Sequence, residues 1–176
     1  MKISGRLEST RARARAAATA VLLVACVAPL VAAQDSGIPV GSAGPDAALE
    51  TLAGEPVQLH SVVGEKPVLI EFWATWCSVC KALEPTITAA QKKFGDRVHF
   101  VGVAVSANQS AERVRRYTAE HMRGFTHFYD RRGHGVEAYD VPATSYIVVL
   151  DASGKVVYTG VGEDQDLDAV LTKVLR

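Results

Sequence analysis

The sequence contains few cysteines, no excess charge of either sign and no internal repeat. Three cysteines among 176 residues are too few for a small protein held together by disulfides, so the core must come from ordinary apolar packing. Nineteen basic and 19 acidic side chains give zero net charge, which argues against a nucleic-acid-binding protein. No repeat recurs at a solenoid period. With 48% hydrophobic residues, the composition is typical of one soluble globular domain.

Charge is unevenly placed along the chain. Residues 1–33 carry five basic side chains and one acidic side chain. The apolar run 16–33 follows this basic head and ends in Val31-Ala32-Ala33, which matches a secretory signal peptide with an A-x-A-like cleavage site. We therefore expect residues 1–33 to be a signal peptide, residues 34–44 a linker and residues 45–176 the folded domain.

Two other interpretations of residues 1–33 stay open. The apolar run is just long enough for an uncleaved membrane anchor, although Pro29 weakens that interpretation. The stretch Leu23-Val24-Ala25-Cys26 also resembles a bacterial lipoprotein box, which would place a lipid on Cys26. All three interpretations predict a domain that works outside the cytoplasm, in a periplasm or similar bacterial compartment. The chain would contact a membrane only through its N-terminal segment, and only if that segment is uncleaved or lipidated.

Short β-rich runs alternate with helical stretches after residue 45, and this alternation predicts a mixed α/β sheet. The run 67–74 is nearly all apolar, as expected for a central strand buried on both faces, and Glu71 is its one charged residue. Strands are expected at 67–74, 98–105, 125–129, 145–150 and 155–159, with a hairpin or edge strand within 49–59. Helices are expected at 77–94, 110–122 and 167–175, and Pro85 should kink the first of these without ending it.

The residues with redox chemistry are Cys77 and Cys80 in the stretch Trp76-Cys77-Ser78-Val79-Cys80, where the buried strand leads into the first helix. Positions i and i+3 at a helix start share one face, so the two sulfurs can form a disulfide. Cys77 lies at the helix N-terminus, where unpaired amides favour the thiolate, and we expect it to be the nucleophile. Cys80 lies one turn further, and we expect it to be less accessible and to resolve the mixed disulfide.

Other uses of a Cys-x-x-Cys pair compete with this interpretation. Zinc requires four ligands, and the five histidines show no paired ligand spacing. A purely structural disulfide across so small a ring would remove little chain entropy. Cu(I) binding is the stronger rival, because soft thiolate ligands select that ion. A Cu(I) metallochaperone that uses Cys77 and Cys80 is therefore the alternative function.

The stretch 68–81, together with Pro85 and Val141-Pro142-Ala143-Thr144, resembles the thioredoxin superfamily. The N-terminal segment and the second half are most similar to exported members of the TlpA, ResA and CcmG type. The resemblance spans residues 45–176 and implies a thioredoxin-like α/β fold, a central mixed sheet flanked by helices with an N-terminal strand or hairpin extension. It also implies a thiol–disulfide oxidoreductase that needs no bound cofactor.

The same resemblance assigns further roles. It implies a cis bond before Pro142, facing the two cysteines, and backbone hydrogen bonds from Val141 to an extended substrate segment. Glu71 falls where thioredoxins hold a buried acid. The implied partners are client proteins with thiols or disulfides, such as apocytochrome c or a copper-site assembly protein, and a membrane thiol electron donor.

Glu71 is informative without the resemblance. A carboxyl within an apolar strand loses hydration, which raises its pKa and allows proton exchange near neutral pH. We therefore expect Glu71 to accept the proton of Cys80 during resolution, directly or through water. The competing interpretations are a strand-edge residue that faces solvent, or an ion-pair partner of Lys66 or Lys81.

Aromatic and basic residues near the motif carry weaker predictions. We expect Trp76 to form part of the surface that contacts substrate. The basic stretch 113–116 is expected to be a solvated helix face, and His127 is expected to be a packing residue without a function of its own.

Overall fold

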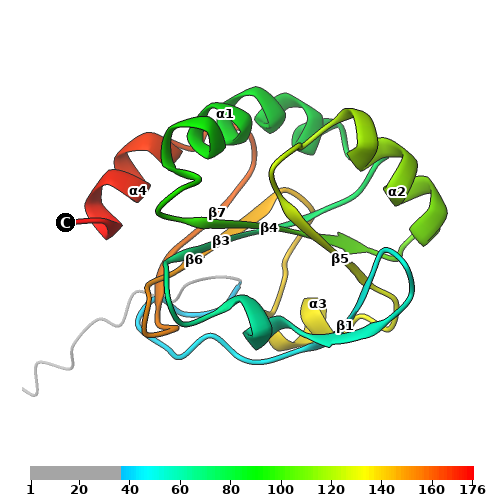
Figure 1. Ribbon diagram of the computed structural model, residues 1–176, viewed down its shortest axis with the longest axis horizontal. Coiled ribbons are helices and arrows are strands. Elements are labelled where there is room, and N and C mark those ends of the chain that lie inside the picture. The colour runs from blue at the N-terminus through cyan, green and yellow to red at the C-terminus, as the bar shows by residue number, and fades with distance from the viewer. Residues whose placement is uncertain (1–36) are drawn as a thin grey trace, which may run out of the picture. The chain divides into compact units, whose positions relative to one another are not determined.

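A computed structural model describes residues 37–176 (Figure 1). The signal-peptide prediction for residues 1–33, including the lipid prediction for Cys26, lies outside the described residues. Of the expected linker, residues 37–44 are described, and they run beside the C-terminal hairpin: Gly41 N–H donates to the carbonyl of Val156, and Gly44 N–H to that of Gly154.

Seven strands form one mixed sheet in the order β2-β1-β5-β4-β3-β6-β7. Strands β3, β4 and β5 are parallel to one another, and β6 pairs with β3 in the antiparallel direction. The strands are β1 (Ala48–Thr51), β2 (Pro56–Gln58), β3 (Val68–Trp73), β4 (His99–Val105), β5 (Thr126–Asp130), β6 (Tyr146–Leu150) and β7 (Val156–Val161).

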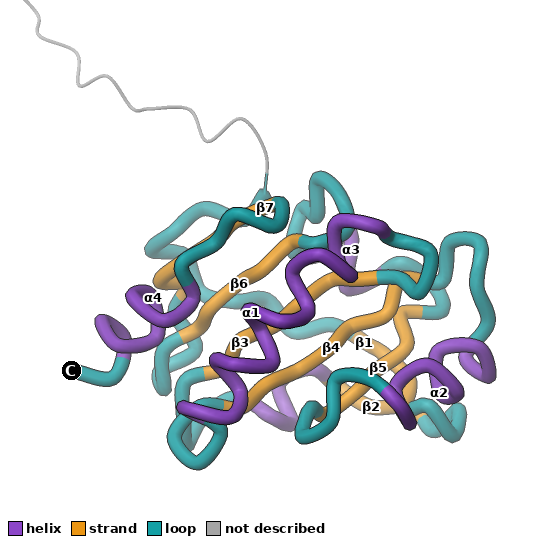
Figure 2. Tube along the Cα trace, turned by 90° about the horizontal axis from the view of Figure 1, so that it is seen from above, coloured by secondary structure: helices purple, strands orange, loops and turns teal. Residues whose placement is uncertain are grey.

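Helices cover both faces of this sheet (Figures 1 and 2). They are η1, a 3-10 helix (Leu59–Val62), and the α-helices α1 (Ser78–Phe94), α2 (Ala111–Glu120), α3 (His134–Ala138) and α4 (Leu167–Val174). On one face, Leu83 and Ile87 of α1 and Leu171 of α4 pack with Leu69 of β3. On the other face, Leu59 of η1 and Tyr139 after α3 pack with Phe72 of β3.

All six residues of β3 are buried. This explains why the run reads as almost continuously apolar, since both of its faces lie under helices and both of its edges pair with other strands. The Cys-x-x-Cys motif follows the carboxyl end of β3, where the chain leaves this central strand and begins α1.

Most of the expected elements are confirmed. The predicted strands and the three long helices all form, and Pro85 lies inside a continuous α1. The N-terminal extension is a hairpin of β1 and β2, with Leu49 opposite Val57. Helix α3 was not predicted. It is only five residues long, and its first turn is fixed by the buried Asp130, which accepts a hydrogen bond from Val136 N–H.

The predicted cis bond before Pro142 is wrong, because residues 37–176 contain no cis peptide bond. The chain turns instead through Asp140 (φ 45°) and Ser145 (φ 67°), which both adopt left-handed backbone conformations. Ser145 N–H then donates to the carbonyl of Phe72 and starts the pairing of β6 with β3. These two turn residues reverse the chain direction, so a trans bond fits before the proline.

Candidate functional site

A disulfide joins Cys77 and Cys80, whose Cα atoms are 5.3 Å apart. Cys77 is the N-cap of α1, and its Sγ accepts a hydrogen bond from the backbone N–H of Cys80 at 3.0 Å. Both cysteines are nearly buried, 5% and 6% exposed, so the expected difference in their accessibility is wrong for this oxidised form. The two sulfurs differ instead in position: only Cys77 occupies the cap and accepts that amide.

The cap position favours a negative charge on Cys77. Unpaired amides and the positive end of the macrodipole meet there, and the first turn of α1 contains no acidic side chain to oppose them. After reduction, the same N–H can donate to the Cys77 thiolate. The pKa of this thiol should therefore lie below that of a free cysteine.

Loop 106–110 holds the motif from the side of β4. Trp76 is 42% exposed, and its indole Nε1–H donates to the carbonyl of Ala107 at 2.7 Å. Gln109 accepts from the N–H of Thr75 and donates to the carbonyl of Val105. This bracing role of Gln109 was not anticipated, because a glutamine in a loop gives no signal in the sequence.

Glu71 lies in β3 on the face covered by α1, between Leu69 and Trp73, and is 1% exposed. Burial, and secondarily the negative charge of Glu84, raise the pKa of Glu71 to about 8. Its Oε1 has no hydrogen-bond partner in the described part of the chain. Glu71 therefore does not face solvent, and no lysine is bonded to its Oε1 within residues 37–176, so neither competing interpretation holds.

Three side chains form a hydrogen-bonded cluster between α1 and α2. Glu84 accepts from the Tyr117 hydroxyl at 2.9 Å, and its other oxygen lies 2.8 Å from His121 Nδ1. Tyr117 also stacks on His121 and packs against Trp73. Burial, and then Glu84, raise the pKa of Tyr117, so its hydroxyl stays protonated and continues to donate. The cluster fixes α2 beside the start of α1.

Val141 and Pro142 lie in the loop that precedes β6. Val141 is half-buried against the core around Phe72, and its N–H already donates to the carbonyl of Val136. Its carbonyl is the remaining backbone group that can meet a substrate. Pro142 is exposed. The bond from Ser145 to Phe72 ties this loop to the end of β3 that leads to the cysteines.

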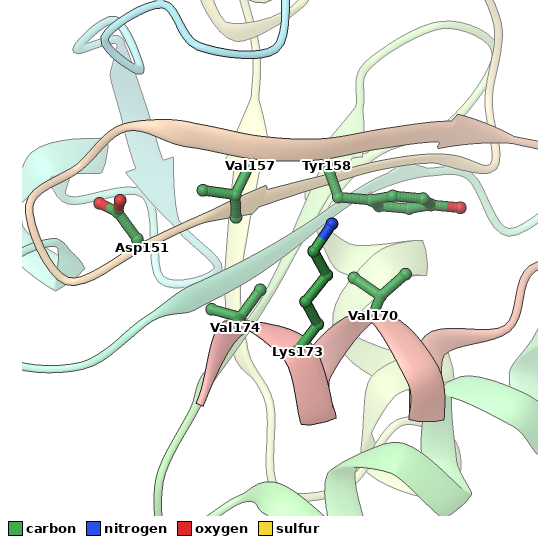
Figure 3. Close-up of a pocket in the computed structure, with 6 residues that line it drawn as sticks. All are labelled: Asp151, Val157, Tyr158, Val170, Lys173 and Val174. Atoms are coloured by element: carbon green, nitrogen blue, oxygen red, sulfur yellow. The ribbon is translucent and has the colours of Figure 1, made fainter. Parts of the chain in front are cut away.

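Two hollows lie on different parts of the domain. One, of about 340 Å³, adjoins the motif between α1 and α2, and its lining residues are Thr75, Lys81, Arg113, Arg116, Tyr117, Glu120 and His121. Another, of about 360 Å³, lies between β7 and α4 (Figure 3), lined by Asp151, Val157, Tyr158, Val170, Lys173 and Val174. Neither lining includes a cysteine, but the first contains Thr75 and Lys81, which flank the Cys77–Cys80 pair in the sequence.

No group of three or more His, Cys, Asp or Glu side chains within residues 37–176 is arranged to hold a metal ion. None of the helices in this region has both the length and the apolar character needed to cross a membrane.

Comparisons with known proteins agree with this geometry. The Redoxin family pattern matches residues 39–175. The thioredoxin-like protein YneN of Bacillus subtilis is 33% identical over 130 residues, which cover 73% of this chain and 75% of that protein. The thiol-disulfide oxidoreductase ResA of the same organism is 30% identical over 127 residues, 72% of this chain and 70% of ResA.

Solved structures give the same result. A Chlorobium tepidum protein assigned as a thiol:disulfide interchange protein of the DsbE type superposes with a TM-score of 0.69 at 26% identity, covering 79% of this chain and 99% of that one. A secreted disulfide oxidoreductase of Mycobacterium tuberculosis, homologous to DsbE, gives a TM-score of 0.60 at 25% identity, covering 73% and 93%.

Proposed function

This chain belongs to the Redoxin family and is a thiol–disulfide oxidoreductase of the thioredoxin superfamily. From that premise, we propose that it is an exported enzyme. In this proposal Cys77 attacks the client disulfide, Cys80 resolves the mixed disulfide and Glu71 accepts the proton of Cys80. The observation that carries this assignment of roles is the hydrogen bond from Cys80 N–H to Cys77 Sγ at the start of α1.

The cycle begins from the reduced dithiol. The Cys77 thiolate attacks one sulfur of a client disulfide, forms a mixed disulfide and expels the other client sulfur as a thiolate. Cys80 then transfers its proton to the Glu71 carboxylate and attacks Cys77 Sγ. This step closes the Cys77–Cys80 disulfide and releases the second client sulfur. Two electrons pass from the enzyme to the client in each turnover.

The pKa of about 8 suits Glu71 to this task. A general base works best when its pKa lies near the operating pH and near that of the thiol it deprotonates, and a free cysteine has a pKa of about 8.5. A carboxyl with an ordinary pKa would be several units too weak a base for this transfer.

Clients are proteins with thiols or disulfides. We propose that these clients are extracytoplasmic. The likeness to ResA-type proteins implies apocytochrome c and copper-site assembly proteins as the client classes. A membrane thiol protein would supply the electrons. Trp76, Val141 and Pro142 would form the docking surface. Exposed Trp76 and Val79, 42% and 38% accessible, support contact with an unfolded segment on either side of Cys77.

The decisive experiment combines a reduction potential with trapping of clients. Replacing Cys80 by alanine should leave clients covalently attached to Cys77. Replacing Cys77 by alanine should abolish both trapping and turnover. Ser78→Ala, between the two cysteines, serves as the matched control. If Cys80→Ala traps nothing and the reduced protein retains Cu(I) against excess thiol competitor, the chaperone alternative replaces the enzyme.

Export is tested separately. We expect the mature protein from the extracytoplasmic fraction to begin at Gln34. A chain that keeps residues 1–33 would indicate an anchor, and a lipid that disappears in Cys26→Ala would indicate a lipoprotein. Recovery of the full chain from the cytoplasm alone would contradict all three interpretations.

A further inference from the structure

The hollow of about 340 Å³ between α1 and α2 is more basic than the domain around it. Both helices cover the same face of the sheet (Figure 1). Its lining contains three cations, Lys81, Arg113 and Arg116, against a single acidic residue of the described chain, Glu120. Residues 37–176 carry 14 basic and 17 acidic side chains. The positive charge of the hollow is therefore local and does not follow from the composition of the domain.

Two of these cations are not neutralised by the fold. In the part of the chain that the structure describes, the side chains of Lys81 and Arg113 form no ion pair and no hydrogen bond. Glu84, one turn from Lys81 on α1, is already bonded through both of its oxygens. Arg116 contacts Glu112 one turn away on α2, but both side chains are largely exposed, and such pairs hold weakly. The hollow therefore keeps a positive charge that is available to a ligand.

A buried hydroxyl without a partner belongs to the wall of the same hollow. Thr75 lines it and is only 4% exposed, and its backbone N–H donates to Gln109. Its Oγ1 has no hydrogen-bond partner among the described residues. Buried hydroxyls are normally paired, so Thr75 provides a donor that the fold itself leaves unused. Together with the two unpaired cations, this donor suits the hollow to an anion.

The hollow lies within reach of a client segment that is held at Cys77. Thr75 precedes Cys77 by two residues, and Lys81 directly follows Cys80. Successive Cα atoms are about 3.8 Å apart, so the Cα of Thr75 lies at most about 8 Å from that of Cys77. An extended client chain spans about 3.3 Å per residue, so a side chain about two to four residues from the client cysteine can enter the hollow.

We propose that this hollow binds a carboxylate side chain of the client, an Asp or Glu close in sequence to the reacting cysteine, through Lys81, Arg113 and Thr75. Redox chemistry at Cys77 brings protein segments to this place, and carboxylates are the anions that protein segments carry. The guanidinium of Arg113 can donate two hydrogen bonds to such a group. The carboxylate takes no part in electron transfer, and its binding makes acidic client segments react faster. This inference rests on the proposed function and names the class of client segment that the site prefers.

The test uses symmetric disulfide dimers of short peptides that each contain one cysteine. One pair of peptides has Glu or Gln three residues before the cysteine, and a second pair has Glu or Gln three residues after it. The measurement is the second-order rate constant for reduction of each dimer by the reduced protein at pH 7. With the wild type, we expect one of the Glu peptides to react about fivefold faster than its Gln partner at low salt. This preference should shrink toward unity in about 0.5 M sodium chloride, which screens exposed charges.

Three variants of the protein locate the effect. Lys81→Gln and Arg113→Gln each remove one cation from the hollow, and Thr75→Val removes the hydroxyl while it keeps the shape of the side chain. Each should reduce the ratio of the Glu rate to the Gln rate to about twofold or less. The ratio is taken within one variant, so any change in the reactivity of Cys77 cancels. Arg115→Gln is the matched control, because Arg115 is exposed on the same helix but does not line the hollow.

Equal rates for the Glu and Gln peptides of both pairs, with a wild-type protein that reduces them, overturn the inference and leave the proposed function in place. A preference that Lys81→Gln and Arg113→Gln both retain also overturns it, because the carboxylate then binds elsewhere. So does a preference that Arg115→Gln loses to the same extent, since the effect then comes from the overall charge of α2. The proposed function fails by a different result, the absence of any reaction between the reduced wild type and all four peptides, and the inference would then fall with it.

Discussion

The backbone N–H of Cys80 points at Sγ of Cys77 across 3.0 Å, so the resolving residue itself supports the nucleophile that it later displaces. This bond belongs to the N-cap geometry of α1 and does not depend on the identity of the Cys80 side chain.

The first prediction concerns the reactivity of the two thiols. In Cys80→Ala the supporting amide remains, so Cys77 should react with iodoacetamide at pH 7 at least about tenfold faster than Cys80 does in Cys77→Ala. The pH dependence of each rate gives the two pKa values. Equal rates and an ordinary pKa at Cys77 would contradict the assigned roles.

The second prediction concerns stability and pH. The pKa of Glu71 is raised from 4.5 to about 8. Between these two pH values the folded state therefore holds a proton on Glu71 that the unfolded chain has released. The resulting stability is complete below pH 4.5 and is lost as the pH rises through 8. Glu71→Gln should remove this dependence and make the protein more stable than wild type at pH 8, by on the order of 4 kcal/mol.

Urea unfolding of the oxidised protein at several pH values between 4 and 9 provides the test. Glu65→Gln is the control, because Glu65 is exposed. Parallel curves for wild type and Glu71→Gln across this range would show that the carboxyl does not titrate as a buried group.

The third prediction concerns Glu84, whose negative charge adds to the rise in the pKa of Glu71. Glu84→Gln removes that charge while its amide oxygen still accepts from Tyr117, so the Glu71 titration should move down. An upward shift in Glu84→Gln would show that rearrangement of α2 outweighs the charge.

The fourth prediction concerns the core between α1 and the sheet. Ile87 is fully buried with Leu69 and Leu83, so Ile87→Ala should destabilise the domain by about 3 kcal/mol and Ile87→Val by about 1 kcal/mol. Denaturant unfolding measures both, with the reduction potential as a second readout. A loss below about 1 kcal/mol for the alanine variant would mean that the core collapses into the space.

The fifth prediction concerns client binding by Trp76. Removal of the exposed indole in Trp76→Ala should raise KM for protein disulfides several-fold and leave the alkylation rate of Cys77 unchanged. Val161→Ala alters another exposed apolar side chain and provides the control. If KM stays at the wild-type value, the docking surface does not include Trp76.

The sequence predicts well those features that depend on local pattern. The buried strand at 67–74, the helix after it and the terminal hairpin each show a hydrophobic period or turn signal, and each forms. The cysteine pair follows from its spacing alone. Helix α3 could not be predicted because a segment of five residues shows no hydrophobic period. The trans bond before Pro142 could not be predicted because the backbone there depends on the left-handed conformations of Asp140 and Ser145 on either side.

The surroundings of Glu71 show what cannot be predicted from one sequence. Its burial follows from the apolar strand, but its place opposite Gly102, and that of Gly102 opposite His127, depends on the register of three strands separated by helices. No local pattern encodes that register.

The burial of strand β3 affects how the domain responds to repeated redox cycles. It lies inside the sheet, hydrogen-bonded to β4 and β6 on its two sides, and every one of its side chains is buried. Its amides should be among the last to exchange with deuterium, in both redox forms. The two sulfur atoms are thus attached to the strand that opens least often, and repeated oxidation and reduction should leave the sheet folded.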